Sequence, residues 1–317
     1  MTTIPIITLD AIQASMSKSD ILNAVKEALI AHSKGQIVSP LPGQLLFDAP
    51  KGDCHIKYGY FIGGETYVVK VASGFYDNPK LGLPVNNGIM MVFSAKTGAP
   101  VCVLDDKGWL TNIRTAAAGA LAAQAGAPEQ ISSLGIIGAG EQAELQARWS
   151  CDLLGINAIN VYARSLSKAK AYAERLKQHD INVTISPDIP TLLKNCNLVI
   201  TTTPSNNALI HASDVQPGTH IVAMGTDSPG KQELDAALFQ RAAVIMVDDH
   251  DQCVHHGDYG HAVRGGFVSE NSDIALGTIL AGEKPGRLSE EDITIADLTG
   301  IAAEDLAVAG LAWNNHT

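Results

Sequence analysis

Apolar positions near the start of the chain repeat with the period of a helix. Between Ser19 and Gly35, five of them share one helical face. These residues are Ile21, Leu22, Val25, Ala28 and Leu29. Ser19 is suited to cap the start of the helix, and Gly35 follows its last apolar turn. The pattern predicts an amphipathic helix between these two residues.

Between residues 54 and 105 the pattern changes to short runs typical of strands. The runs are HIKYGYFI, ETYVVKVAS, GIMMVFSA and APVCVLD, and they are rich in β-branched and aromatic residues. Lys96-Thr97-Gly98, between the last two runs, is a hairpin signal. This part of the chain is predicted to form a mostly antiparallel sheet with the N-terminal helix packed on it.

An alanine-rich segment, TNIRTAAAGALAAQAG at residues 111–126, predicts a helix that joins two lobes, because alanine is the best helix former. After it, apolar strand-like runs alternate with amphipathic segments, from SLGIIG to AVIMVD. Such alternation is typical of an α/β fold with a parallel sheet, right-handed crossovers and helices on both faces. After Ile295, the segment ADLTGIAAEDLAVAGLAW predicts a glycine turn and a final helix.

The composition is that of an ordinary globular protein, with 46% hydrophobic and 17% charged residues. A length of 317 residues favours two lobes. No apolar stretch approaches the roughly 20 residues that cross a bilayer. The N-terminus, MTTIPIITLD, lacks the basic and apolar segments of a secretory leader, so we expect a cytoplasmic protein without a membrane partner.

The net charge of −11 has no compensating basic stripe, which argues against nucleic acid or an anionic membrane surface as a partner. A small anionic substrate remains compatible with a few cations that converge locally. The five cysteines are scattered and lack C-x-x-C spacing, so we expect buried free thiols. The His- and Asp-rich segment from His250 to His261 matches no standard zinc spacing, and we expect no metal.

The most specific chemical motif is SLGIIGAGEQAE, a G-x-G-x-x-A pattern between a predicted strand and a predicted helix. Gly138 permits a tight turn, Gly140 lets the backbone approach a pyrophosphate, and Ala143 allows close packing of the helix on the strand. A helix that begins at about Glu141 offers its unpaired N–H groups to phosphates. We therefore assign dinucleotide binding to Gly138, Ala139, Gly140, Glu141 and Gln142.

The next predicted strand indicates which dinucleotide is bound. The segment AINVYARSLSKA offers no Asp or Glu for a free ribose 2′-hydroxyl, but it offers Arg164, Ser165 and Lys168 to a 2′-phosphate. This favours NADPH, with NADH as the alternative; the two cations could also be solvated residues at a helix start. A further strand ends in Thr202-Thr203-Pro204, which is either another cofactor contact or a simple strand end and proline turn.

Four ordered motifs, RTAAAGALAA, LGIIGAGEQA, GTDSPGKQEL and DLTGIAAEDLA, resemble the ornithine cyclodeaminase and mu-crystallin family, above all its delta-1-pyrroline-2-carboxylate (ketimine) reductase members. The resemblance implies a homodimer of two-domain subunits. A substrate-binding and dimerisation domain of α+β type, with a mostly antiparallel sheet, would contain residues 1–112 and 297–317. A Rossmann-type NAD(P)-binding domain would contain residues 113–296. We include Thr299 of the last motif among the cofactor-binding residues.

The resemblance also implies roles for three residues. Lys70, in TYVVKVASGF, and Arg114, in NIRTAAAGA, correspond to cations that hold the substrate carboxylate, and Asp227, in GTDSPGKQEL, corresponds to the catalytic aspartate. Arg114 can grip a carboxylate with two hydrogen bonds, while Lys70 adds a point charge. From the residues alone, Lys70 could instead be a strand-edge lysine, Arg114 a salt-bridge partner at a helix start, and Asp227 the N-cap of a helix over PGKQELDAALF.

Two departures from the family pattern bear on the substrate. A further carboxylate-binding arginine, expected in a Pro-x-Arg context, is missing, and SPLPGQLLF offers only Gln44 in its place. The acidic residue that cyclodeaminases use to handle ornithine is replaced by Lys57, which would repel a substrate with two amino groups. Lys57 could also be a solvated hairpin lysine; it faces inward only if His55 does, because alternate strand residues share a face.

These observations predict NAD(P)H-dependent reduction of a cyclic imino acid. Delta-1-pyrroline-2-carboxylate would accept a hydride at its iminium carbon and give L-proline, and the six-membered homologue would give L-pipecolate. Arg114 and Lys70, with Lys57 and Gln44, would bind the substrate, and Asp227 would favour the iminium charge and relay a proton. The alternatives are ornithine cyclodeaminase or alanine dehydrogenase chemistry, or a non-catalytic protein that binds NADPH or another ligand.

Overall fold

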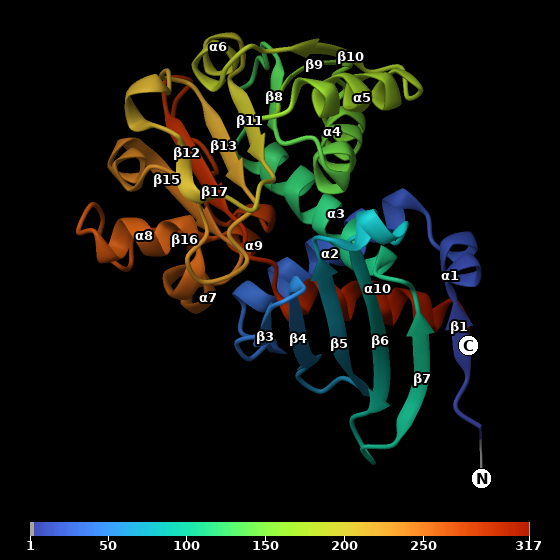
Figure 1. Cartoon of the computed structure of the whole chain (residues 1–317). Coiled ribbons are helices and arrows are strands. Elements are labelled where there is room, and N and C mark those ends of the chain that lie inside the picture. Colours follow the sequence, from blue (N-terminus) through green and yellow to red (C-terminus); the bar gives the residue numbers. More distant parts are fainter. Residues whose placement is uncertain (1–2, 317) are drawn as a thin grey trace. The chain divides into compact units, whose positions relative to one another are not determined.

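The computed structural model describes residues 3–316 of the chain (Figure 1). The chain folds into two compact units, each made of contacts within itself. Unit 1 contains residues 1–115 and 301–317, and unit 2 contains residues 116–300. Both have mixed α/β structure, one with a mostly antiparallel and one with a parallel sheet, as the sequence pattern predicts.

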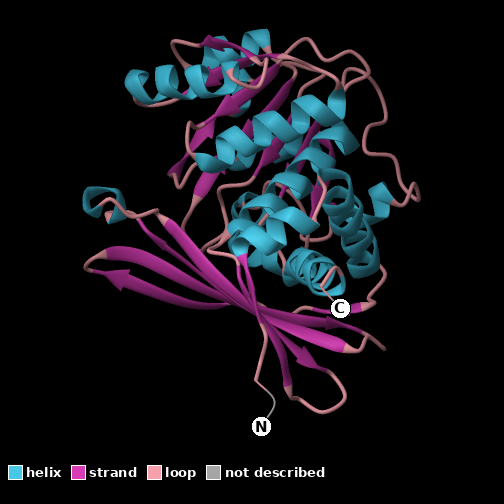
Figure 2. Cartoon of the chain, turned by 90° about the vertical axis from the view of Figure 1, so that its right-hand side faces the viewer, coloured by secondary structure: helices cyan, strands magenta, loops and turns pink. Residues whose placement is uncertain are grey.

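Unit 1 is built on a seven-stranded, strongly twisted sheet (Figure 2). Its strands are β1 (Ile6–Thr8), β2 (Ile37–Val38), β3 (Gly43–Asp48), β4 (Lys51–Phe61), β5 (Thr66–Phe75), β6 (Asn86–Ser94) and β7 (Pro100–Asp105). The order is β1-β7-β6-β5-β4-β2, with β3 also paired to β4. Every pair is antiparallel except β1 with β7. The predicted strand runs therefore form adjacent strands of one sheet.

Two long helices pack in unit 1: α2 (Lys18–Ser33) lies against α10 (Ala302–Asn314), and α10 also contacts β4, β5 and β7. Shorter elements are α1 (Leu9–Ser15) and the 3₁₀ turn η1 (Asn78–Leu81). The prediction of Ser19 as the N-cap of α2 is wrong. Ser17 caps the helix instead, because its hydroxyl accepts the Asp20 N–H while the Asp20 carboxylate accepts the Ser17 N–H.

The alanine-rich helix α3 (Trp109–Gly126) begins in unit 1 and ends in unit 2. It starts two residues before the predicted segment. The Asp106 carboxylate accepts the Leu110 N–H at 2.8 Å and so satisfies one of the unpaired donors of the first turn.

Unit 2 is built on an eight-stranded, wholly parallel sheet. Its strands, in spatial order, are β10 (Asn182–Ile185), β9 (Ala158–Tyr162), β8 (Leu134–Ile137), β11 (Leu198–Thr201), β13 (His220–Ala223), β17 (Ile293–Asp297), β15 (Ala242–Val247) and β16 (Asp273–Ala275). The four central strands β8, β11, β13 and β17 are buried along their whole length. Their near-continuous apolar sequences are typical of strands covered on both faces.

The helices of unit 2 are α4 (Glu141–Leu154), α5 (Leu166–Lys177), α6 (Ile189–Asn195), α7 (His250–His256), α8 (Asp258–Arg264) and α9 (Leu276–Leu280), with the 3₁₀ turn η2 (Ala212–Asp214). A small parallel pair is formed by β12 (Asn206–Ile210) and β14 (Gln232–Leu234). The helix weighed for PGKQELDAALF does not form. That segment makes β14 and then the 3₁₀ helix η3 (Ala236–Arg241), whose start is capped by the Asp235 carboxylate.

The cysteines bear out one prediction: all five are free and buried. Within residues 3–316 no helix combines the length and apolarity that crossing a membrane requires. In the His-rich segment, His250 pairs with Asp273 at 2.9 Å and Asp258 accepts backbone N–H groups of β14. These side chains therefore serve contacts within unit 2.

Candidate active site

The cations predicted to hold a carboxylate lie on one face of the unit 1 sheet. Lys57 of β4 and Lys70 of β5 are in direct register, so their side chains project to the same face. Both are buried, with exposed fractions of 5% and 1%. These facts contradict a solvated hairpin lysine at position 57 and a strand-edge lysine at position 70, because β5 lies between β4 and β6.

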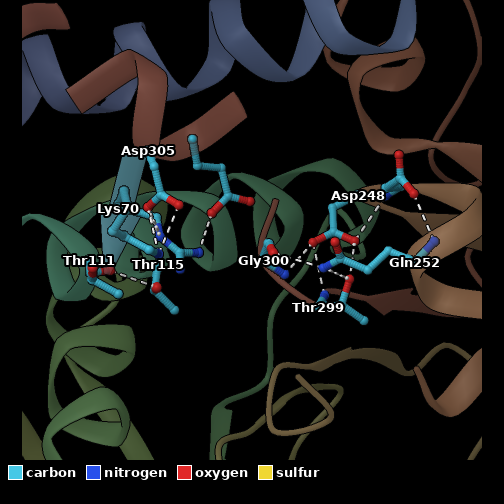
Figure 3. Close-up of polar contacts among 11 residues, drawn as sticks. Lys70, Thr111, Thr115, Asp248, Gln252, Thr299, Gly300 and Asp305 are labelled. Atoms are coloured by element: carbon cyan, nitrogen blue, oxygen red, sulfur yellow. Dashed lines mark hydrogen bonds and ion pairs between the residues drawn. The ribbon is translucent and has the colours of Figure 1, made fainter. Parts of the chain in front are cut away.

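Two carboxylates of α10, those of Glu304 and Asp305, form ion pairs with Lys70 and Arg114. Lys70 points toward the Asp305 carboxylate (Figure 3). Its Nζ lies 2.9 Å from Asp305 Oδ1 and 2.8 Å from Asp305 Oδ2. Arg114 of α3 donates to Glu304 Oε2 at 2.5 Å, and its Nε lies 3.1 Å from Asp305 Oδ1. The salt-bridge interpretation of Arg114 is therefore correct, and its predicted role toward a substrate stays a prediction.

Burial and neighbouring charges alter the titration of this cluster. Burial lowers the pKa of Lys70 to about 7; Asp305 opposes the shift, while Arg114 and Lys57 add to it. The pKa of Asp305 is lowered although burial alone would raise it, because Lys70, Arg114 and Lys57 favour its charged form. A third carboxyl, Asp106, feels the charge of Lys70, and burial raises its pKa. Lys70 can therefore change protonation near neutral pH.

Gln44 lies on the same side of the sheet as the cations. It is in register with His55 on β4, and His55 shares a face with Lys57 two residues later. His55 is mostly buried, and its Nε2 lies 3.7 Å from Asp53 Oδ1. The inward placement of Lys57 thus goes together with that of His55, as strand alternation requires.

The glycine motif of unit 2 forms the expected strand, turn and helix. β8 ends at Ile137, Gly138 has a φ of 129°, and α4 begins at Glu141 with Gly140 at its N-cap. Only glycine fits at position 138, since a Cβ there would lie 2.5 Å from the Thr202 Oγ1. At Gly140 a Cβ would meet no atom within 4 Å. The turn therefore leaves open space beside the start of α4, which suits a bound pyrophosphate.

The residues predicted to contact a 2′-phosphate follow β9. Ser165 is the N-cap of α5, and its hydroxyl accepts the Lys168 N–H at 3.4 Å. Arg164 and Lys168 are exposed and form no ion pair with any residue that the structure describes. Both cations are therefore available to a phosphate, which is compatible with the NADPH prediction and with the solvated alternative.

Thr202, Thr203 and Pro204 follow β11 directly. The Thr202 N–H donates to the Ile137 carbonyl at 3.0 Å, so this strand end packs against the glycine turn. The Thr203 N–H and hydroxyl both donate to Glu233, at 2.6 and 2.7 Å.

Asp227 lies in the loop after β13, and 44% of its side chain is exposed. Its Oδ1 is 2.5 Å from the Lys231 Nζ and accepts from the Ser228 hydroxyl at 3.2 Å. It caps no helix, because β14 rather than a helix follows. An exposed carboxylate remains compatible with the predicted proton transfer.

Thr299, after β17, is buried and bonded within unit 2 (Figure 3). Its N–H and hydroxyl donate to the Asp248 carboxylate at 2.9 and 3.0 Å, and the Gln252 Nε2 donates to its hydroxyl at 2.9 Å. The Gly300 N–H donates to the same carboxylate at 2.6 Å. Asp248 therefore fixes this turn, and a cofactor contact by Thr299 stays a prediction.

Sequence reasoning assigned no role to Glu304 and Asp305, although both stand in a motif that it singled out. A signal was present: the pair is the only charge in the otherwise apolar segment IAAEDLAVAGLAW. Buried acidic residues need a compensating partner, so this pattern predicts one in the fold. It does not indicate which cation.

The two sheets and the glycine turn define a protein with a Rossmann-type dinucleotide-binding fold and a second α+β unit. The chain belongs to the ornithine cyclodeaminase/mu-crystallin family, whose model matches residues 5–317. An alanine dehydrogenase of Archaeoglobus fulgidus is 33% identical over 311 residues, which cover 98% of this chain and 94% of that one. An uncharacterized cyclodeaminase of Sinorhizobium fredii is 39% identical over 277 residues, or 86% and 84% of the two chains.

Solved structures are also similar to this chain over nearly its whole length. The delta-1-pyrroline-2-carboxylate reductase of Thermococcus litoralis, in complex with NADH and L-proline, is 26% identical with a TM-score of 0.90 and covers 98% of this chain and 97% of its own. A dimeric archaeal alanine dehydrogenase with bound NAD has a TM-score of 0.88 at 33% identity and covers 98% and 95%. Relatives that carry a nicotinamide cofactor thus share the whole fold, while their substrates differ.

Proposed function

We propose that the protein is a nicotinamide-dependent reductase of cyclic α-imino acids, with delta-1-pyrroline-2-carboxylate as substrate and L-proline as product. The six-membered homologue would give L-pipecolate. In this proposal unit 1 binds the substrate carboxylate and unit 2 binds the cofactor. The observation that carries it is the buried pair Lys57 and Lys70, directly opposite each other on neighbouring strands beside Arg114.

Two like charges placed opposite each other destabilise a sheet unless an opposite charge compensates them. Asp305 compensates part of the charge here, and Glu304 is bonded to Arg114. A substrate carboxylate would supply further negative charge. The same arrangement disfavours ornithine, because two cationic amino groups would face Lys57 and Lys70.

The nucleotide would lie with its pyrophosphate at Gly138, Ala139 and Gly140 and at the first residues of α4, Glu141 and Gln142. Three features support the fit: the open space at Gly140, the helix start behind it, and the packing of Thr202 on Gly138. Among nicotinamide cofactors we propose NADPH, because Arg164 and Lys168 follow β9, are exposed and form no ion pair with a described residue, and Ser165 adds a hydroxyl.

The chemistry divides between charge stabilisation and positioning. A bound nicotinamide supplies a hydride. Arg114 and Lys70 hold the carboxylate and fix the imine carbon in one orientation, which removes much of the entropic cost of the reaction. Asp227 stabilises the iminium charge and can return a proton after the transfer, since its carboxylate is partly exposed and already interacts with the cationic Lys231.

We also propose that two copies associate through the sheet of unit 1. Exposed apolar and aromatic side chains lie on β3 (Leu45 and Phe47), on β4 (Tyr58 and Tyr60) and directly after β4 (Ile62). An exposed apolar patch on this scale is typical of an association site. The mass in solution tests this: a dimer is expected, a Tyr60→Lys variant should weaken it, and a monomeric wild-type protein would contradict it.

The function is tested by the rate of NADPH oxidation with five- and six-membered cyclic imino acids. Pyruvate with ammonia, iminosuccinate and ornithine serve as comparisons, because alanine dehydrogenase and iminosuccinate reductase occur among the relatives. We expect kcat/KM for a cyclic imino acid to exceed those of the comparisons by at least about 100-fold, which even a difference in fit within an apolar pocket can provide. A higher value for pyruvate with ammonia would identify an alanine dehydrogenase instead.

A matched pair of variants connects the activity to unit 1. Lys70→Met keeps the length of the side chain but removes its charge, and should raise KM for the imino acid. Lys107→Met removes an exposed lysine that forms an ion pair with the nearby Asp105, and should leave KM unchanged. Equal KM values for the two variants would exclude Lys70 from substrate binding.

A further inference from the structure

Glu233 of β14 is a fully buried carboxylate of unit 2, and it stands in the same motif as Asp227, GTDSPGKQEL. Its Oε1 accepts the Thr203 N–H at 2.6 Å and the Thr203 hydroxyl at 2.7 Å. Its Oε2 accepts the Thr201 hydroxyl at 2.6 Å and the Gly225 N–H at 2.7 Å. Four donors thus converge on one carboxylate from two different strand ends.

The first strand end, after β11, adjoins the glycine turn at Gly138. Thr201 and Thr203 stand on either side of Thr202, whose Oγ1 occupies the place that a Cβ on Gly138 would need. By bonding both neighbours, Glu233 fixes Thr202 against the glycine turn. A shift of this strand end would therefore alter the surface on which the dinucleotide is proposed to lie.

The second strand end, after β13, leads to the proposed proton-transfer residue. Gly225 is two residues before Asp227, and a Cβ on Gly225 would overlap the Thr203 carbonyl and lie 2.6 Å from the Glu233 Oε2. The two loops therefore meet at Glu233 with room for glycine alone. Its own backbone is held as well, since the Glu233 N–H donates to the Asp258 carboxylate at 2.9 Å.

We propose that Glu233 is a positioning residue that holds the nucleotide-binding strand end and the Asp227 loop in one fixed arrangement. The inference rests on the proposed cofactor site and on the proposed role of Asp227. It adds that their relative placement depends on one carboxylate that touches neither substrate nor cofactor.

The donors around Glu233 require a carboxylate rather than an amide. Each oxygen accepts one backbone N–H, and a backbone N–H can never act as an acceptor. A glutamine at this position would have to place its NH₂ group against the Thr203 N–H or the Gly225 N–H, whichever way the amide is turned. One buried donor would lose its partner in either orientation, so the strand end it belongs to would move.

Glu233→Gln in the full chain is the direct test, with Asp235→Asn as its matched control. Asp235 is two residues away, its carboxylate also accepts backbone N–H groups, and within residues 3–316 its donors are Ala212 and Ala237 rather than residues of the two loops. We expect the dissociation constant of NADPH to rise and kcat to fall in Glu233→Gln, each by about 10- to 100-fold, as for a misplacement of catalytic groups by a fraction of an ångström. The control should match the wild-type protein in both.

Amide hydrogen exchange gives a readout that does not depend on turnover. In Glu233→Gln the Thr203 or the Gly225 amide should exchange faster than in the wild-type protein, whereas the central strand β8 should not change. If Glu233 were merely structural, Glu233→Gln would accelerate amide exchange throughout the sheet. The affinity of the remaining folded protein for NADPH would then be unaltered. That result would overturn the proposal.

If Glu233→Gln does not fold, Thr201→Val replaces it, because it removes one of the four donors while keeping size and β-propensity. It should weaken NADPH binding by about 3- to 10-fold, the effect of one net hydrogen bond. Unchanged binding and kcat in that variant would overturn the inference. A wild-type protein that binds no nicotinamide at all would instead contradict the proposed function, so the two failures are distinguishable.

Discussion

Buried carboxylates occur in both units, but the two units compensate them differently. In unit 1, Asp305 lies against Lys70 and Arg114, and these charges keep its pKa below the usual value. In unit 2, Asp297 accepts the Tyr259 N–H and the Thr226 hydroxyl and forms no ion pair with a cation among residues 3–316. Burial raises its pKa to about 7. One kind of residue is thus a fixed charge in one unit and a titrating group in the other.

The difference indicates what each cluster is suited to do. Ion pairs hold Lys70 and Arg114 of unit 1 in place, which suits a site that binds an anion. The carboxyl groups of unit 2, Glu233, Asp248, Asp258 and Asp297, instead accept N–H and O–H groups from other segments of the same unit. Several of these bonds fix segments that directly follow its parallel strands, the edge at which ligands of such sheets generally bind.

The largest effect is expected from breaking the ion pairs of unit 1. Arg114→Ala removes the arginine that the buried Glu304 and Asp305 both contact, and should lower the free energy of unfolding by about 3–5 kcal/mol. KM for the imino acid should rise as well. Urea unfolding and steady-state kinetics measure the two effects, with Lys107→Ala as an exposed control. A variant as stable as the control would show that these ion pairs carry no stability.

The next effect concerns the carboxyl groups of unit 2. An aspartate whose folded pKa is raised from 3.8 to about 7 destabilises the fold increasingly as pH rises from about 4 to about 7, because only the unfolded chain gives up its proton freely there. Asp297→Asn keeps the acceptor for Tyr259 and cannot ionise. At pH 8 it should be more stable than the wild-type protein by of order 2 kcal/mol. Thermal unfolding of both proteins at pH 5 and pH 8 measures this difference in stability. An equal loss of stability between the two pH values in both proteins would contradict it.

Cofactor choice depends on exposed charges, so a smaller change is expected there. Arg164→Asp should shift the ratio of kcat/KM for NADPH and NADH toward NADH by about 10-fold or more, since a carboxylate repels a 2′-phosphate and accepts a ribose hydroxyl. Arg175→Asp serves as control, because Arg175 is a partly exposed arginine of α5 that pairs with Glu144 on the preceding helix, α4. If the ratio stays at the wild-type value, Arg164 does not contact the nucleotide.

The smallest effect is expected on the affinity for a carboxylate ligand, which should change gradually with pH. Because the pKa of Lys70 is lowered to about 7, its ammonium is present below that pH and lost above it. The affinity for a carboxylate ligand that does not itself titrate, such as pyrrole-2-carboxylate, should be highest below pH 7 and should weaken by up to about 10-fold per pH unit above it. In Lys70→Arg the charge persists, so the affinity should be nearly independent of pH. A wild-type affinity independent of pH would remove Lys70 from the carboxylate site.

Much of the fold follows from local pattern, because a strand or helix of an α/β protein is encoded by a few neighbouring residues. The runs HIKYGYFI and ETYVVKVAS became adjacent antiparallel strands, and SLGIIGAGEQAE became the expected strand, turn and helix. Two local choices were wrong. Ser17 rather than Ser19 caps α2, and β14 forms where a helix was weighed, because its pairing with β12 outweighs local helix propensity.

The partners within the site could not be predicted from local pattern. Asp305 is 235 residues from Lys70 along the chain, and only the fold brings them together. The register that places Lys57 opposite Lys70 likewise depends on hairpin geometry rather than on either strand alone. The family resemblance supplied the cations and Asp227, but it gave no sign that Glu233 bonds the ends of two strands.

Transfer of deuterium tests the central claim most directly. NADPH deuterated at its transferable hydride position is incubated with the protein and delta-1-pyrroline-2-carboxylate, and the product is examined by mass spectrometry and NMR. We expect the wild-type protein to form L-proline that carries one deuterium on its α-carbon. Lys70→Met should form the same product much more slowly. Oxidation of NADPH without deuterium in the product, or no reaction while pyruvate and ammonia give deuterated alanine, would contradict it.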